Sequence, residues 1–194
     1  MTIGNTQQRI LETSAERFAT KGYDALTMRD IATACNIKAP SLYNHFKDKQ
    51  ELYQATLKHV FSHQGQDLIA CLETNHPAEQ KLDNFIALAC EQMAANQTFR
   101  KLFIRELLEQ DEQHLQFLAK EVMADACYAL HDVFIELKPN CDPHFLTTSL
   151  LALVFFHFQA NSVRLYLPGG NEQTLSLEYL TQNIQKMIRQ QLHA

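Results

Sequence analysis

The sequence is poor in residues that interrupt helices, because its 194 residues include only 5 glycines and 5 prolines. β-Branched residues rarely fall in alternating runs, so strands are not expected. Leu, Ala, Gln, Glu and Lys recur instead at helical spacing, and apolar residues make up 46% of the chain. This composition argues against a disordered chain and predicts an all-α protein of about nine helices.

The sequence also lacks signals for export or membrane insertion. Residues 1–8 are polar, and the apolar stretch at 150–158 is too short to span a bilayer. The number of cysteines is odd, and none forms a C-x-x-C pair. We therefore expect a cytoplasmic protein with no membrane contact and no cofactor, whose thiols stay free and buried; a redox role has no support. These thiols are Cys35, Cys71, Cys90, Cys127 and Cys141.

An overall excess of basic charge, typical of nucleic-acid-binding proteins, is missing too, since the formal net charge is −5. The charge is, however, unevenly distributed. Through Lys49 the chain carries seven basic and five acidic side chains, a net of +2, which leaves −7 for the remainder. A mildly basic N-terminal segment followed by an acidic remainder is compatible with a small DNA-binding module.

The N-terminal segment contains a series of helix boundaries. Apolar residues at helical spacing predict a first helix over residues 6–21, and Gly22 suits the position after its last turn. Thr27 and Asp30 lie three positions apart, as the two members of a capping box do. They predict that a short second helix begins here.

Asn36 and Pro40 predict a tight turn followed by a third helix. Asn tolerates the left-handed backbone conformation that such a turn needs, and Ile37 can fill the angle between the helices. Pro40 suits a first helical turn, where its missing N–H has no partner to lose. Leu42 and Phe46 are four positions apart and face inward, which leaves their polar neighbours outside.

The rest of the chain shows further amphipathic or apolar helices. Asp48 with Glu51 is a capping signal for the next helix, and the Pro-Gly-Gly-Asn sequence at 168–171 separates the last two. We expect these helices over about residues 49–71, 77–93, 99–108, 115–137, 143–167 and 174–191.

Two short helices joined by a tight turn, with polar residues outward on the second, place a recognition helix in the major groove of DNA. The start of the helix at Thr27 offers backbone N–H groups to a phosphate, and Arg29 can reach a guanine edge. Ala39 and Pro40 can touch a thymine methyl group. The predicted DNA-contacting residues are Thr27, Arg29, Lys38, Ala39, Pro40, Ser41, Tyr43, Asn44, His45 and Lys49.

The run at residues 31–49, IATACNIKAPSLYNHFKDK, resembles without gaps the signature of the TetR (tetracycline-repressor-like) family. Phe18, Gly22, Tyr23 and Thr27 also match that family's N-terminal pattern. The resemblance implies a homodimer with a three-helix DNA-binding head and a helical-bundle body that binds an effector and dimerises. The corresponding ranges are 1–50 for the head, 51–194 for the body, and about 143–167 and 174–191 for the two helices that dimerise.

The resemblance also implies roles for single residues. Tyr43, His45 and Lys49 stand where the family contacts phosphates, Thr27 matches its helix-start residue, and Arg29, Ala39 and Pro40 fall at or near base-contacting positions. Two positions depart from the family pattern. Asn36 replaces the usual Gly, and Ala39-Pro40 stands where a pair such as Lys-Gly is frequent, so the base preference of relatives does not transfer.

Each of these residues also has a structural alternative. Tyr43 could be a partly buried aromatic that braces the head, and His45 a solvated surface histidine. Arg29 could pair with Asp30 or with an acid of the first helix, a contact that would stabilise the fold by only about 0–1 kcal/mol.

The body holds candidates for an effector pocket. Arg105, Glu106 and His157 lie in apolar surroundings, where they could orient a ligand or form a structural polar pair or a dimer contact. Metal binding by His157 with His114 or Glu106 lacks a supporting spacing, so no metal is expected. Aromatic and Met residues could line the pocket or simply form core. These are Phe85, Met93, Phe103, Phe117, Met123, Phe134, Phe155 and Phe156.

The sequence thus predicts a DNA-binding transcriptional regulator. A repressor released from a near-palindromic operator by a small apolar or amphipathic effector is favoured. The alternatives are an activator, or a dimer that recruits a protein partner without an effector. An enzyme is not expected, because the chain has no nucleophile elbow, phosphate loop or zinc motif.

Overall fold

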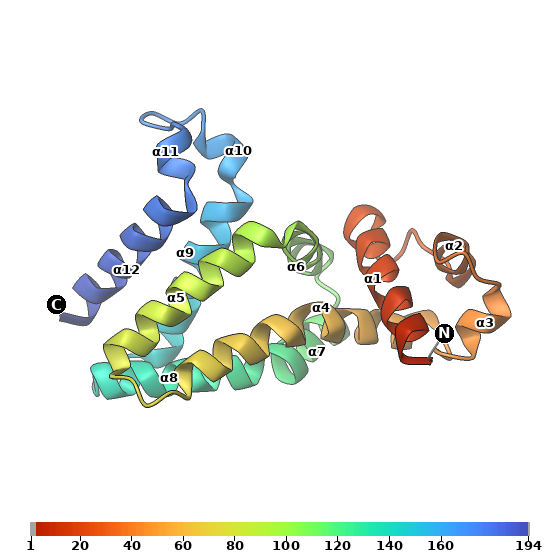
Figure 1. Ribbon diagram of the computed structural model, residues 1–194, viewed down its shortest axis with the longest axis horizontal. Coiled ribbons are helices and arrows are strands. Elements are labelled where there is room, and N and C mark those ends of the chain that lie inside the picture. The colour runs from red at the N-terminus through yellow and green to blue at the C-terminus, as the bar shows by residue number, and fades with distance from the viewer. Residues whose placement is uncertain (1–2, 194) are drawn as a thin grey trace. The chain divides into compact units, whose positions relative to one another are not determined.

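The computed structural model describes residues 3–193, and all regular structure in that range is helical (Figure 1). The all-α prediction is therefore confirmed. The helices are α1 (Ile3–Lys21), α2 (Met28–Ala34), α3 (Ala39–Tyr43), α4 (Lys49–Leu72), α5 (Ala78–Ala95), α6 (Gln97–Glu109), α7 (Glu112–Phe117), the π-helix η1 (Leu118–Met123), α8 (Ala124–Leu137), α9 (Pro143–Gln159), α10 (Asn161–Arg164), α11 (Glu172–Leu175) and α12 (Leu177–His193).

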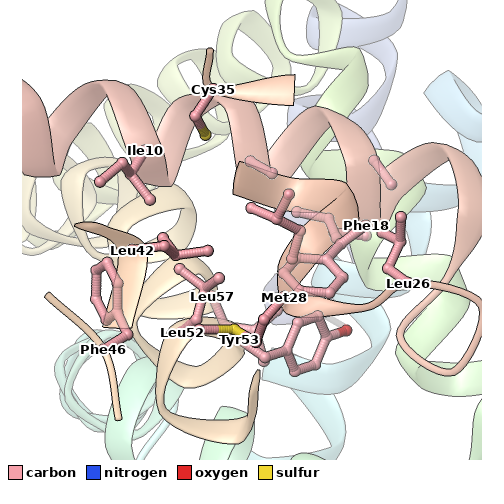
Figure 2. Close-up of a cluster of buried hydrophobic side chains, with 14 of the residues drawn as sticks. Ile10, Phe18, Leu26, Met28, Cys35, Leu42, Phe46, Leu52, Tyr53 and Leu57 are labelled. Atoms are coloured by element: carbon pink, nitrogen blue, oxygen red, sulfur yellow. The ribbon is translucent and has the colours of Figure 1, made fainter. Parts of the chain in front are cut away.

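The helices form two compact units. The first unit joins the chain through residue 63 to Thr98–Met123, so it contains α1–α3, the first part of α4, most of α6, and α7 with η1. Its core is built from side chains of all the N-terminal helices, and Figure 2 shows them converging. Phe18, Leu42 and Leu52 have no exposed surface there. The sequence predicts a division of the chain by function, into a DNA-binding head at residues 1–50 and a body at 51–194. This division stays a prediction.

The second unit comprises residues 64–97 and 124–194. Within it α5 packs against α8, α9 and α12, and α9 also contacts α8 and α12. Its core takes Phe85 and Ile86 from α5, Phe134 from α8 and Leu150 from α9. These four side chains are at most 1% exposed, so the unit has a hydrophobic core of its own.

The prediction of a single helix over 115–137 is wrong, because the π-helix η1 separates α7 from α8 in this range. A π-helix forms hydrogen bonds one residue longer than those of an α-helix, which inserts a residue into the turn without changing the composition. The apolar pattern runs on through Leu118, Val122 and Met123. Nothing in that pattern marks the change of hydrogen bonding.

The helix expected over 143–167 is also shorter than predicted. It ends at Gln159, and α10 follows Ala160 as a separate single turn. The break at 168–171 is confirmed: a Cβ on Gly170 would lie 2.2 Å from the Arg164 carbonyl oxygen, so only glycine fits. The short helix α11 and its own cap at Asn171 precede α12, where one helix over 174–191 was expected.

Candidate nucleic-acid interface

The start of α2 has the predicted capping box. The Asp30 N–H donates to Thr27 Oγ1 at 3.2 Å, and the Thr27 N–H and hydroxyl both donate to Asp30 Oδ2, at 2.9 and 2.6 Å. These bonds lower the pKa of Asp30 below its usual value. The capping box fixes where α2 begins, and it occupies the hydroxyl of Thr27 within the head.

The turn between α2 and α3 is built as the sequence predicts. Asn36 has a φ of 55°, in the left-handed region, and the Ile37 N–H donates to the Ala32 carbonyl oxygen at 3.0 Å. Ile37 packs on the head core, and Pro40 stands in the first turn of α3. Leu42 is fully buried, so α3 is anchored by its inner face and turns its other side outward.

The predicted DNA-contacting residues divide by exposure. Thr27, Arg29, Lys38, Pro40, Tyr43 and Asn44 are exposed, and Ala39, Ser41, His45 and Lys49 are half-buried. Tyr43 is 50% exposed, which disfavours the alternative in which it is a buried brace. Among residues 3–193 the Arg29 guanidinium makes no ion pair, so the alternative of pairing with Asp30 finds no support.

Lys49 makes contacts inside the head. Its Nζ donates to the Tyr23 carbonyl oxygen at 3.0 Å and lies 4.0 Å from the centroid of the Tyr23 ring. Both contacts tie the start of α4 to the connection between α1 and α2. An ammonium has three N–H groups, so a phosphate can still share it, but the structural role is the one observed here.

The predicted effector residues are distributed over both units. Phe103, Arg105, Glu106, Phe117 and Met123 lie in the first unit, and Phe85, Met93, Phe134, Phe155 and His157 lie in the second. Phe85 and Phe134 are closely packed core residues of their unit. A groove of 590 Å³ runs along α12, and it is lined by long polar and charged side chains such as Gln185, Lys186 and Arg189. These placements leave the effector pocket a prediction.

Arg105 and Glu106, predicted as ligand-orienting residues, both have partners within the first unit. Arg105 Nε and Nη2 donate to the carbonyl oxygens of Ala19 and Thr20, at 2.9 and 2.6 Å, and so cap the last turn of α1. A Cβ on Gly22 would lie 2.8 Å from Glu109 Oε1 and 3.0 Å from Arg105 Nη1. The positive φ of 84° and this close approach of α6 both require glycine at position 22.

Glu106 belongs to a buried polar cluster that the sequence did not predict. The Tyr53 hydroxyl donates to Glu106 Oε1, and His114 Nδ1 lies 3.8 Å from Glu106 Oε2. Burial and the neighbouring carboxylate of Glu106 raise the pKa of Tyr53. Tyr53 gave no signal, since it is adjacent to Leu52 in an apolar stripe and resembles a core aromatic.

Neither a metal cluster nor a membrane helix is found in the part of the chain that the structure describes. No group of three or more His, Cys, Asp or Glu side chains is placed to hold an ion. No helix within residues 3–193 is long and apolar enough to cross a bilayer.

The capped helix α2, the tight turn and the short helix α3 together form a helix-turn-helix. The buried Leu42 anchors α3, and the residues exposed on and beside this helix are Lys38, Pro40, Tyr43 and Asn44. The sequence profile of the bacterial regulatory proteins of the tetR family matches residues 10–56, from α1 into α4. Residues 10–56 therefore form a DNA-binding domain of the TetR type, and the chain is a DNA-binding regulator of transcription.

Similar proteins agree with this assignment. The chain is 26% identical over 164 residues to IcaR of Staphylococcus epidermidis, a negative transcriptional regulator of the biofilm operon icaADBC, covering 80% of this chain and 84% of IcaR. Two solved structures share the fold. They are the fatty acid degradation regulator FadR of Bacillus halodurans (TM-score 0.75, 15% identity, 97% of this chain and 96% of that chain) and AibR in complex with isovaleryl coenzyme A and operator DNA (TM-score 0.72, 20% identity, 94% and 97%).

Proposed function

We propose that the chain is a cytoplasmic homodimeric repressor that leaves its operator when a small apolar or amphipathic effector binds the body. Residues 1–50 contact DNA through the ten residues predicted above, and residues 51–194 bind the effector and dimerise. Two recognition helices then lie about 34 Å apart, the length of one DNA turn, and meet the halves of a near-palindromic site.

The observation that carries the dimer is an unpartnered apolar face on α9 and α12. Phe145 and Phe156 of α9 are 60% and 64% exposed, and they lie eleven positions apart, three helical turns, so they share a face. Met187 on α12 is 51% exposed, and Tyr179 is exposed too. Because α9 and α12 pack side by side, these residues suit an interface between copies of the chain.

Repression and the binding of an effector are supported by what similar proteins do. IcaR is a negative regulator, and AibR was solved with isovaleryl coenzyme A together with operator DNA. An effector that favours one conformation of the dimer lowers operator affinity by its differential affinity for the two conformations, typically about 1–3 kcal/mol.

Fluorescence anisotropy on a duplex that the protein selects from a random library tests release. Isovaleryl coenzyme A, longer acyl thioesters and free fatty acids are titrated into the complex, with coenzyme A as the matched control. We expect one acyl compound to weaken operator binding by about 5–150-fold, while coenzyme A does not. If no compound changes the affinity or the thermal midpoint, and a protein partner copurifies, the partner-recruiting alternative holds instead.

A further inference from the structure

Tyr53, Glu106 and His114 form a polar cluster inside the first unit. They come from α4, α6 and α7, and none is more than 5% exposed, so none of them can contact DNA. The Tyr53 hydroxyl donates to one carboxylate oxygen of Glu106. The other oxygen, Oε2, and His114 Nδ1 are both buried without a hydrogen-bond partner, and they lie 3.8 Å apart. Buried polar atoms without partners are rare, and 3.8 Å is too long for a hydrogen bond, so neither atom relieves the cost of burying the other.

The cluster contacts the residues that hold the DNA-binding helices together. The Tyr53 ring lies edge-on to Phe18 of α1 with centroids 4.6 Å apart, and 4.8 Å from the Tyr23 ring. The His114 ring is also 4.8 Å from the Tyr23 ring. Tyr23 is in turn bound by Lys49. Glu106 therefore reaches α1 and the α1–α2 connection through the phenol ring that it binds.

Burial is the largest influence on Glu106, and it raises the pKa of this carboxyl; Glu109 and Asp111 act in the same direction, while Tyr53 and His114 oppose it. A carboxyl with a raised pKa favours the fold fully at low pH, and this contribution is lost as the pH rises through the raised pKa. Titratable and charged groups face the cluster from every element around it. They are Asp48, Lys49 and Tyr53 at the start of α4, Arg105 and Glu109 from α6, Asp111 and His114 from the start of α7, and Tyr23 with Asp24 between α1 and α2.

We propose that Glu106 is a positioning residue for DNA binding, which holds α4 and α1 in place through Tyr53 as long as its carboxyl stays protonated. Loss of the proton strengthens the hydrogen bond from Tyr53, but it leaves a carboxylate charge in a site that excludes water. This burial cost is the larger effect, and it loosens the packing of α6 against α4. The inference rests on DNA binding by the first unit. It adds a control of that binding by pH, through residues that lie behind the DNA-contacting surface.

Glu106→Gln tests the proposal, because the amide keeps the shape and the acceptor for Tyr53 but cannot ionise. Anisotropy on the selected duplex is measured from about pH 5.5 to 8.5 for wild type, Glu106→Gln and the control Glu112→Gln, which removes an exposed carboxylate of α7. We expect wild type and the control to lose about fivefold or more in affinity as the pH rises, the low end of typical coupling, and Glu106→Gln to lose less. His45, which is ionisable and near the DNA, is common to all three proteins and cancels in the comparison.

Parallel profiles for wild type and Glu106→Gln would overturn the proposal. Tyr53→Phe is a second test: the Tyr53 hydrogen bond lowers the pKa of Glu106, so its removal should move the loss of affinity to higher pH, and an unmoved profile contradicts the proposal. Thermal midpoints followed by circular dichroism over the same pH range need no DNA. Suppose that the midpoint depends on pH, that Glu106→Gln removes this dependence, and that no variant binds the duplex. The proposed DNA binding would then be wrong, while the dependence of the fold on a protonated Glu106 would stand.

Discussion

Replacing Phe156 with aspartate is expected to separate the proposed dimer and to abolish tight operator binding. Burying an unpaired carboxylate in an apolar interface costs more free energy than the contact between the two copies contributes. Each monomer then binds one half-site alone. Joining two half-sites in one complex typically raises affinity by about 10²–10⁴-fold, so the variant should lose a factor of this size. Sedimentation or light scattering reports the dimer, and anisotropy on the selected duplex reports binding.

The matched control is Tyr128→Asp, which places the same charge at an aromatic residue of α8 that is 66% exposed. It should stay dimeric and keep wild-type affinity. If Phe156→Asp remained a dimer with undiminished affinity, the α9–α12 face would not be the interface.

Replacing Phe18 with alanine should destabilise the protein by about 3–5 kcal/mol, the usual loss for a buried Phe. Phe18 has no exposed surface, and its ring lies against Tyr53 and stacks 6.1 Å from Tyr23. Figure 2 shows Phe18 among buried side chains of α2 and α4, such as Met28 and Tyr53, so its removal takes contacts from several helices at once. Chemical denaturation followed by circular dichroism measures the change in the free energy of unfolding.

Leu108→Ala serves as the control in the same unit, because this leucine is 74% exposed. Its effect should stay within about 0.5 kcal/mol. A loss below about 1 kcal/mol for Phe18→Ala would mean that the head does not depend on this core.

The helix-turn-helix could be predicted in detail because its determinants are local. The Thr27–Asp30 capping box, the left-handed Asn36 and the first-turn Pro40 each act within a few residues, and the structure confirms all three. The resemblance to the TetR family used the same short segment. Signals of this kind need no knowledge of how distant parts of the chain meet.

Features that depend on distant contacts escaped prediction. The π-helix η1 leaves the apolar pattern unchanged, so a single helix over 115–137 was expected. Glu106 was singled out as a charge in an apolar helix, but its partners Tyr53 and His114 come from other helices. Sequence spacing gives no information on pairs 53 positions apart, and Tyr53 on its own resembles ordinary core.

The central claim, that the α2–α3 surface recognises a specific DNA sequence, is tested most directly by Arg29→Ala and Tyr43→Ala on the selected duplex and on a scrambled one. Wild type should prefer the selected duplex at physiological salt. Tyr43→Ala should weaken binding to both duplexes by a similar factor, because a phosphate contact carries no sequence information. Arg29→Ala should cost about 1–3 kcal/mol on the selected duplex alone and change the preferred base. Equal binding of wild type to both duplexes would contradict the account.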